Sequence, residues 1–242
     1  MPDLPRKPGR PRDKKLAARR CDEILDVAVA VFAEHGYRLT DVQEIADRLG
    51  MGKGTVYRYF ATKEDLFLAA VDRGMRWLQE TIDAQIAETA DPLEQMRRAV
   101  RAYLAYFDTH PELVELLIQE RAEFKDRKQS TYACYEEQCR LSRRDRLASL
   151  QEQGLVRKIP VDQIIDVGNY VMYGAIFINH LAGRRKTFQE QADEILDVMM
   201  HGILKPGTPD GATASQTQDG QDRRPGDRSR QRTADKSRGE SR

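Results

Sequence analysis

The chain of 242 residues carries 40 Lys and Arg against 39 Asp and Glu, a formal net charge of +1 at pH 7. Its apolar share of 40% is ample for a core, and its length allows one or two domains. No apolar run reaches the roughly 18 residues of a membrane span, and the charged N-terminus lacks an apolar signal segment. We therefore expect a cytoplasmic protein that makes no membrane contact.

The three cysteines, Cys21, Cys134 and Cys139, are too few and too irregular for a disulfide framework. The sequence favours buried thiols in helices. The alternative is a redox switch that uses Cys134 and Cys139, although five residues of helix would place them on different sides and strain a disulfide.

The small net charge conceals an uneven distribution along the chain. Residues 1–20 hold eight basic and two acidic residues, a balance of +6, and residues 206–242 hold eight and six, a balance of +2. Subtracting both from +1 leaves −7 for the middle of the chain. A basic end beside an acidic body is typical of a protein that meets nucleic acid at one end only.

Residues 1–15 are too rich in proline and charge to fold alone, so we expect a disordered basic arm. The run from Arg6 to Arg12 resembles an AT-hook core, in which Gly-Arg-Pro lies extended in an A·T-rich minor groove. Arg10 would then meet the negative potential of the narrow groove. The alternative is a solvated tail that attracts DNA without specificity, and both interpretations stay open.

Residues 16–62 predict a three-helix head. The first helix begins near Lys15 and stops at Gly36. The next begins with Thr40 as N-cap, and Gln43 closes a capping box. Its buried face has the i, i+3, i+4, i+7 spacing of a helix and consists of Val42, Ile45, Ala46 and Leu49. Gly50 follows directly, where the chain needs a positive φ to leave the helix.

After this turn, Val56 and Phe60 are four residues apart and are expected to face the preceding helix. The side chains left facing outward are Lys53, Thr55, Tyr57, Arg58 and Tyr59. Such a set suits a recognition helix in a major groove, because basic groups bind phosphates or guanine and hydroxyls bind phosphates or bases. The alternative is a plain corner between two helices with solvated side chains.

The string IADRLGMGKGTVYRYFATKEDL closely resembles the DNA-binding domain of TetR/AcrR-type transcriptional regulators. The resemblance covers about residues 20–70, including the glycine turn and Lys63 before an acidic helix start. It implies an all-α protein of about nine helices, with a larger helical domain for effector binding and dimerisation behind the head. The DNA contacts that it implies are Gln43, Lys53, Gly54, Thr55, Tyr57, Arg58, Tyr59 and Lys63. Among these, Arg58 would bind guanine O6 and N7, and Lys63 would hold a phosphate.

Residues 63–205 predict the helical effector-binding and dimerisation domain. Thr62 caps a helix that reaches about Glu88, with acidic residues in its first turn. Further helix starts are predicted at Pro92 behind Asp91, at Pro111, near Arg127, at Pro160 and at the Thr187–Glu190 capping box, with stops at Gly154 and Gly183. No convincing strand is present.

The stretch 160–182 is apolar around most of its circumference, which is more than one core face in a single chain requires. We expect it to pair, together with residues 187–204, with its two-fold mates in a four-helix bundle, as the resembled family does. The predicted interface consists of Gly168, Met172, Ala175, Ile176, Ile195 and Met199. Such a homodimer would present recognition helices to successive major grooves of a near-palindromic operator, roughly 34–36 Å apart.

The middle helices are the expected place for an effector pocket. Its predicted walls are Trp77, Tyr103, Phe107, Phe124, Tyr135, Tyr173 and Phe177, with Glu120 as a polar handle. Aromatic residues at helical spacing fit a core equally well. The pattern of the resembled family favours a small lipophilic ligand that moves the linker helix and lowers operator affinity. The acidic middle of the chain adds a preference for a cationic lipophile and for control of an efflux gene.

The four histidines are scattered, and the sequence lacks HExxH, paired CxxC and a glycine-rich phosphate loop. We therefore expect neither an enzyme nor a metal or cofactor. Residues 206–242 lack large apolar side chains and predict a disordered tail. The predicted function is a sequence-specific, homodimeric DNA-binding repressor. The alternative is a helix-turn-helix protein that is controlled by a protein partner or acts on chromosome organisation, without a small effector.

Overall fold

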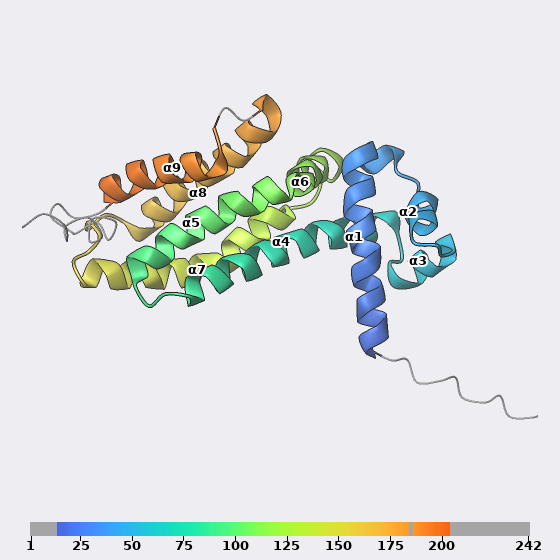
Figure 1. Cartoon of the computed structure of the whole chain (residues 1–242), viewed down its shortest axis with the longest axis horizontal. Coiled ribbons are helices and arrows are strands. Elements are labelled where there is room, and N and C mark those ends of the chain that lie inside the picture. The colour runs from blue at the N-terminus through green and yellow to red at the C-terminus, as the bar shows by residue number, and fades with distance from the viewer. Residues whose placement is uncertain (1–13, 184–185, 204–242) are drawn as a thin grey trace, which may run out of the picture. The chain divides into compact units, whose positions relative to one another are not determined.

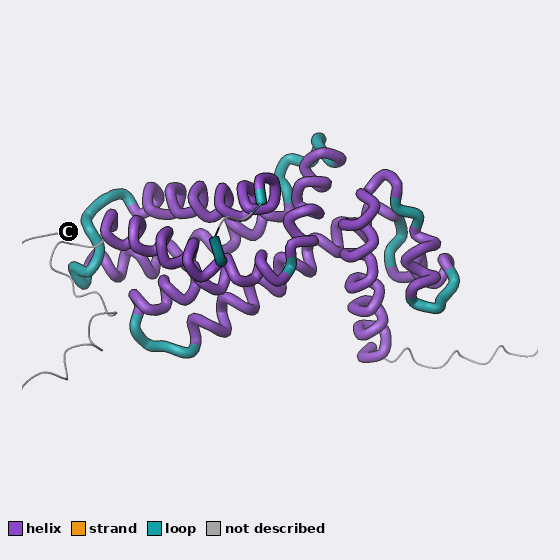
Figure 2. The backbone as a smooth tube through the Cα atoms, turned by 45° about the horizontal axis from the view of Figure 1, so that its top comes forward, coloured by secondary structure: helices purple, strands orange, loops and turns teal. Residues whose placement is uncertain are grey.

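The computed structural model describes residues 14–183 and 186–203, and every element in these two ranges is an α-helix (Figures 1 and 2). The helices are α1 (Lys14–Leu39), α2 (Val42–Arg48), α3 (Lys53–Tyr59), α4 (Lys63–Ala87), α5 (Pro92–Thr109), α6 (Pro111–Glu123), α7 (Thr131–Glu152), α8 (Val161–Ala182) and α9 (Phe188–Ile203). The predicted all-α fold of about nine helices is confirmed for this part of the chain. The predicted arm, with Arg10, and the predicted tail lie outside the described residues.

The head, α1 to α3, packs around one buried face of α1. Ile24, Val31 and Phe32 of this face are fully buried, as are Ile45 of α2 and Val56 of α3. In Figure 1, α2 and α3 lie side by side next to α1, and α2 contacts both α1 and α3. The i, i+3, i+4 pattern of the sequence thus defines the buried faces of all three helices.

The N-cap predicted for α2 is wrong by one residue. Asp41, not Thr40, caps the helix, because its side chain accepts a hydrogen bond from the backbone N–H of Gln43 at 2.8 Å. Thr40 is buried and donates from its hydroxyl to the carbonyl oxygen of Gly36 at 2.8 Å. Gly36 has a φ of 79°, so the helical backbone breaks there and Thr40 closes the end of α1.

The start of α4 agrees with the sequence. Thr62 accepts a hydrogen bond from the backbone N–H of Asp65, and the Asp65 carboxylate accepts one from that of Thr62. This reciprocal capping box satisfies two N–H groups that a helix start leaves without partners. The cap fixes where α4 leaves the head.

Behind the head, α4, α5, α7, α8 and α9 run side by side (Figures 1 and 2), and neighbouring pairs are in contact. The shorter helix α6 contacts α1, α4, α5 and α8. We call α4 to α9 the body. None of the described helices is long and apolar enough to cross a membrane.

Glycine and proline mark most helix ends in the body as predicted. Asp91 caps α5, with Pro92 in its first turn. Gly154 and Gly183 have φ values of 74° and 73° just after α7 and α8. One boundary differs, since α7 begins at Thr131 rather than near Arg127. Ser130 caps it by accepting from the backbone N–H of Ala133 at 3.3 Å, which the sequence prediction missed.

Helices α4 and α6 cross at unusually short distance beside the head. A Cβ atom at Gly74 would lie only 2.6 Å from Cδ1 of Leu113. The carbonyl oxygen of Gly74 accepts a hydrogen bond from the buried Tyr106 hydroxyl at 2.9 Å. The absent side chain therefore lets α6 pack directly on the α4 backbone.

Aromatic rings join the head to the body. The rings of Phe32 and Tyr37 on α1 contact that of Phe67 on α4, with centroids 5.0 and 5.1 Å apart. Phe124, at the end of α6, closes the cluster at 4.9 Å from Tyr37. Edge-to-face pairs of this kind add to the stabilisation from burial alone. Helices α4 and α6 are thereby in direct contact with α1.

Candidate nucleic-acid interface and interior cavity

The turn between α2 and α3 sets the orientation of α3. Gly50 has a φ of 61°, and the backbone N–H of Met51 donates to the carbonyl oxygen of Ala46 at 2.9 Å. Val56 is fully buried against α2, so one side of the short helix is fixed. The opposite side of α3 therefore faces away from the head.

This outward side carries several of the α3 residues that the sequence assigned to DNA contact, whereas Tyr59 is partly buried and packs against the hydrophobic core. Gly54, Tyr57 and Arg58 are exposed. The Arg58 guanidinium lies 5.8 Å from the ring centre of Tyr59, and it makes no ion pair with any residue that the structure describes. No atom lies within 4 Å of where a Cβ of Gly54 would be, so the helix start is open to a close approach. Arg58 can thus offer both arms of its guanidinium to a base edge.

Lys53 is engaged within the head. Its Nζ lies 2.6 Å from Oδ1 of Asp41, the carboxylate that caps α2. The hydrogen bond from the Gln43 backbone and the contact with Lys53 hold the pKa of Asp41 below its usual value, and the same contact raises the pKa of Lys53. Gln43 itself donates from its side chain to Asp47 at 2.7 Å. A phosphate would have to share or replace these surface contacts.

Lys63 braces the start of α4 against the turn after α1. Its Nζ donates to the carbonyl oxygens of Thr40 and Arg38, at 2.8 and 3.1 Å, and lies 4.8 Å above the ring of Tyr37. Burial lowers the pKa of the Lys63 ammonium. Two of its three N–H groups are used in this brace, which leaves one for a phosphate. The phosphate contact inferred from the sequence stays a prediction.

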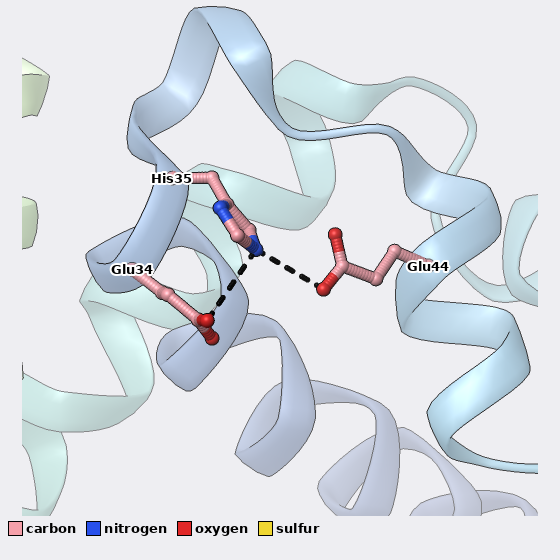
Figure 3. Close-up of side chains that lie close together, drawn as sticks. All are labelled: Glu34, His35 and Glu44. Atoms are coloured by element: carbon pink, nitrogen blue, oxygen red, sulfur yellow. Dashed lines mark hydrogen bonds and ion pairs between the residues drawn. The ribbon is translucent and has the colours of Figure 1, made fainter.

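A further cluster joins α1 to α2 at Glu34, His35 and Glu44 (Figure 3). The imidazole Nε2 of His35 lies 3.1 Å from Glu44 and 3.7 Å from Glu34, and one oxygen or nitrogen of each residue lies within 4.8 Å of the others. Arg48 bonds both carboxylates, at 2.8 and 2.6 Å, and its bond lowers the pKa of Glu44. Because a guanidinium already compensates both charges, the cluster acts as an ion-pair network.

The body contains a partly open cavity of about 440 Å³ between α4, α5, α7, α8 and α9. Five of the seven methionines of the chain line it, namely Met75, Met96, Met172, Met199 and Met200. Methionine side chains are unbranched and polarizable, so they adapt to ligands of irregular shape. Size and apolar lining both match those of small-molecule sites in proteins.

One wall of the cavity, formed by α7, is polar. The hydroxyls of Tyr132 and of Tyr103 on α5 lie 2.9 Å apart, and burial raises the pKa of both. Arg143 bonds Glu136 and Asn169, each at 2.8 Å. Cys139 also lines the cavity, and burial raises the pKa of its thiol, so it stays protonated at neutral pH.

Of the eight predicted pocket residues, Tyr103 and Tyr135 line this cavity and the other six do not. Those outside it are Trp77, Phe107, Glu120, Phe124, Tyr173 and Phe177. Trp77 lies on the surface beside Arg73, and Glu120 is buried while it accepts from the backbone and hydroxyl of Thr131. Phe124 belongs to the aromatic joint with the head, as described above.

Sequence reasoning missed the polar face of α7, because an arginine-rich stretch usually indicates a solvated helix. The lining positions on this helix recur every three or four residues, at Tyr132, Glu136, Cys139, Arg143 and Arg146. This spacing places the five side chains on a single face of the helix, so the sequence contained a signal from which the polar wall could have been predicted.

The six residues predicted for the dimer interface face their own chain instead. Met172, Ala175 and Ile176 are buried within it, and Ile195 packs against the core. Gly168 and Met199 line the cavity, and a Cβ at Gly168 would lie 3.4 Å from Cε of Met199. The exposed apolar residues of these two helices are Val167, Tyr170, Tyr173, Ile178, Leu181 and Val198. These six residues therefore lie on the inward side of α8 and α9, and a dimer through these two helices, which stays a prediction, would use their exposed side.

The head of the protein is similar in sequence to known regulatory proteins. Residues 24–70 match the family of bacterial regulatory proteins called the tetR family. HbdR, an HTH-type transcriptional regulator of Aromatoleum sp. (strain CIB), is 31% identical over 96 residues, which cover 40% of this chain and 42% of HbdR. The chain therefore matches less than half of the length of this relative.

Two further comparisons extend into the body. The HTH-type transcriptional repressor KstR2 of Mycobacterium tuberculosis (strain ATCC 25618 / H37Rv) is 27% identical over 194 residues, 78% of this chain and 94% of KstR2. The structure of this ketosteroid transcriptional regulator superimposes with a TM-score of 0.58 over 77% of this chain and 95% of that one, at 26% identity. A transcriptional regulator from Saccharomonospora viridis in complex with choline shares the fold, with a TM-score of 0.68 at 20% identity over 78% and 99% of the two chains. Residues 24–70 therefore match the tetR family of bacterial regulatory proteins, and the chain as a whole is similar in sequence and fold to HTH-type transcriptional regulators.

Proposed function

We propose that this protein is a homodimeric repressor that leaves a near-palindromic operator when a small lipophilic ligand enters the cavity of the body. In this proposal residues 16–62 bind DNA, and residues 63–205 bind the ligand and the second copy. The observation that carries it is the course of α4. The helix starts at the Lys63 brace in the head and lines the cavity further along with Met75, Leu78 and Ile82.

The contacts of α4 support transmission of ligand binding to the head. Near its middle, the buried Arg73 bonds Asp26 at 2.8 Å and the carbonyl oxygen of Asp22, both on α1. Lys63 bonds the connection between α1 and α2. A ligand that displaces the cavity part of α4 would therefore rotate α1 and the recognition helix with it. Release follows only if the ligand binds the rotated state more tightly.

The exposed apolar side of α8 supports pairing with a second copy. Tyr170 and Leu181 are each 74% exposed and Ile178 is 64% exposed. Val167 belongs to the same set. In chain order the four residues are Val167, Tyr170, Ile178 and Leu181, and their spacings of three, eight and three residues place them along one stripe of the helix. An apolar stripe of this length favours a protein contact, and a two-fold axis would pair it with itself. The two copies of α3 would then enter successive major grooves, roughly 34–36 Å apart.

The proposed direction of regulation is supported by KstR2, whose similarity extends over 78% of this chain. KstR2 is described as a repressor and as a ketosteroid regulator, and 94% of its length aligns with this protein. We therefore propose repression of genes that remove a lipophilic compound. Such genes could encode an efflux protein that exports the compound, as favoured from the sequence, or enzymes that break it down.

The experiment that tests the proposal is fluorescence anisotropy of the full-length protein on DNA from upstream of its own gene. Scrambled DNA of equal length and a salt series provide the comparison. We expect selective binding that survives physiological salt. Arg58→Ala should lose about 1–3 kcal/mol, mainly at one base position, because a bidentate contact to guanine is removed.

Arg157→Ala is the matched control, because Arg157 is exposed in the loop after α7, outside the head. It should bind like the unaltered protein. Equal, steeply salt-dependent binding to both DNAs would contradict the proposal, since only phosphate attraction would remain. Equal losses for Arg58→Ala on operator and scrambled DNA would contradict the role of Arg58 in reading the sequence.

A further inference from the structure

The wall of the cavity contains four charged side chains, and three of them are accounted for within the protein. Glu136 and Arg143 form an ion pair at 2.8 Å and neutralise each other. The carboxylate of Asp83 is exposed to solvent and accepts a hydrogen bond from the side chain of Gln79 at 2.8 Å. Neither the ion pair nor the solvated carboxylate leaves an unbalanced charge inside the cavity.

Arg146 is the fourth charged residue and differs from the others. It is half-buried, and it makes no hydrogen bond or ion pair with any residue that the structure describes. A guanidinium has five N–H donors and stays charged at any physiological pH. Partial burial of such a group beside apolar side chains is unfavourable unless an acceptor compensates it. The cavity wall therefore presents one positive charge, that of Arg146, which a ligand could neutralise.

The cavity is elongated, and Arg146 lies near one end of it. On α7 the lining residues run from Tyr132 to Leu147, and Arg146 lies fourteen residues after Tyr132, about 21 Å along the helix at 1.5 Å per residue. Helix α4 runs in the same direction, because Asp72 bonds Tyr135 and Gln79 bonds Cys139. The end with Arg146 is therefore the end away from the head.

The part of the cavity nearer the head is apolar on its α4 and α8 sides, while Tyr132 and Glu136 of α7 line its polar side. Met75 and Leu78 of α4 line it on one side and Met172 of α8 on another. A cation at one end and the apolar α4 and α8 sides toward the head together match a molecule with a charged head group and a lipophilic tail. The tail would reach the segment of α4 that begins next to Gly74, where α6 crosses at short distance.

We propose that the effector of this regulator is a lipophilic carboxylate whose head group binds Arg146 and whose tail extends along α4 toward Met75. The planar carboxylate matches the fork of the guanidinium and accepts two parallel hydrogen bonds. This inference rests on the proposed function, because it names the chemical class of the ligand in that cavity. It replaces the cationic lipophile expected from the acidic middle of the sequence, since net charge does not describe the wall of one cavity.

The test compares three probes that share one tail and differ in the charge of the head group: dodecanoate, 1-dodecanol and dodecylamine. Isothermal titration calorimetry of each into the full-length protein gives the affinities. We expect dodecanoate to bind about tenfold or more tightly than dodecanol, and dodecylamine to bind weakest. In Arg146→Gln, dodecanoate should lose about tenfold or more in affinity, while dodecanol should bind as before.

Arg144→Gln is the matched control. Arg144 lies on the same helix but outside the cavity, 3.6 Å from Asp162 of α8. It should bind dodecanoate like the unaltered protein. Tightest binding of dodecylamine, equal affinities for all three probes, or binding of none of them would overturn the proposed class, as would an equal loss in both variants.

Anisotropy on operator DNA then separates this inference from the proposed function. Dodecanoate that binds through Arg146 and lowers operator affinity supports both. Dodecanoate that binds through Arg146 and leaves operator affinity unchanged supports the ligand class and contradicts ligand-controlled release. Release by dodecanol or dodecylamine, without preferential binding of dodecanoate, supports ligand-controlled release and overturns the ligand class.

Discussion

The side-chain amide of Gln119 on α6 donates a hydrogen bond to the backbone carbonyl oxygen of Phe32 on α1, at 3.0 Å inside the core. Gln119 also donates to Glu115, and the second oxygen of Glu115 lies 3.0 Å from Nε2 of His180 on α8. A continuous chain of polar contacts thus connects α8, which lines the cavity and carries the exposed apolar stripe, with the first helix of the head. Such a chain can couple the two regions, because its members cannot move independently.

Replacing Gln119 should weaken both the fold and this coupling. Gln119→Leu removes the bond to Phe32, and we expect a loss of about 1 kcal/mol in the free energy of unfolding. It should also reduce the factor by which a ligand changes operator affinity, without changing ligand affinity in the absence of DNA. Urea denaturation and anisotropy measure the two effects. Gln85→Leu, which removes only a surface contact with Glu88 near the end of α4, is the control. Identical behaviour of the two variants would contradict the coupling role.

Substitution of a helical glycine by alanine should have opposite effects on stability at Gly74 and at Gly54. Gly74→Ala would place a Cβ 2.6 Å from Leu113, so α4 and α6 must move apart. Overpacking of this kind costs about 1–3 kcal/mol, against a gain of up to about 1 kcal/mol in helix propensity, so we expect a net loss of stability. Gly54→Ala meets no atom within 4 Å and should keep or raise stability.

In contrast, Gly54→Ala should lower operator affinity, because Gly54 lies on the outward side of α3, where DNA is expected to approach. Thermal unfolding and anisotropy on both variants check these expectations. Lower stability for Gly54→Ala than for Gly74→Ala, or unchanged operator affinity in Gly54→Ala, would contradict this account of the two sites.

The helix ends were predictable from the sequence because they depend on local backbone geometry. Gly50, Gly154 and Gly183 adopt positive φ values that other residues disfavour, so each marks an end wherever the fold places it. The capping box at Thr62 is local in the same way. In contrast, Thr40 and Asp41 are both good caps, and only the break at Gly36 decides between them.

The exposed side of α8 and the cavity were not predictable in this way. Because α8 is apolar around most of its surface, its periodicity does not tell the buried Ile176 from the exposed Tyr170. The cavity depends on how five helices pack, and no residue type marks the space that they leave open. The unpaired state of Arg146 is likewise a property of the folded chain, since several acidic residues are within reach in the sequence.

Stability at alkaline pH should depend on Tyr106. Burial raises the pKa of its phenol from 10 to about 12. The folded state therefore keeps a proton that the unfolded chain releases above pH 10. The contribution to stability is fully present below pH 10 and is lost as the pH rises from 10 to about 12. Tyr106→Phe removes this titration, so its free energy of unfolding should fall less steeply across this window than that of the unaltered protein.

Chemical denaturation at a series of pH values measures the slope. Tyr135, whose pKa burial also raises to about 12, titrates in the same window, so the slope should decrease without disappearing. Tyr57→Phe, on the exposed side of α3 and outside the stripe of α8, is the control and should keep the slope of the unaltered protein. An equal decrease in both variants would contradict the assignment to Tyr106.

The exposed stripe of α8 predicts where a single charge breaks the dimer. Ile178→Asp places a carboxylate in the proposed contact, next to its two-fold mate, where burial without a partner is strongly unfavourable. We expect the protein to become monomeric at micromolar concentration, while its helix content is retained because Ile178 is 64% exposed in the single chain. Size-exclusion chromatography with light scattering measures the mass, and operator affinity should fall because one head reads only one half-site.

Leu141→Asp tests whether any exposed leucine-sized side chain would have the same effect. Leu141 is 71% exposed on α7, outside the stripe, so this variant should remain dimeric and bind the operator as before. A monomeric unaltered protein would contradict the dimer itself. Loss of the dimer in Leu141→Asp but not in Ile178→Asp would place the contact on α7. A dimer in both variants would require an interface that uses neither helix face, and the stripe of α8 would then need a different partner.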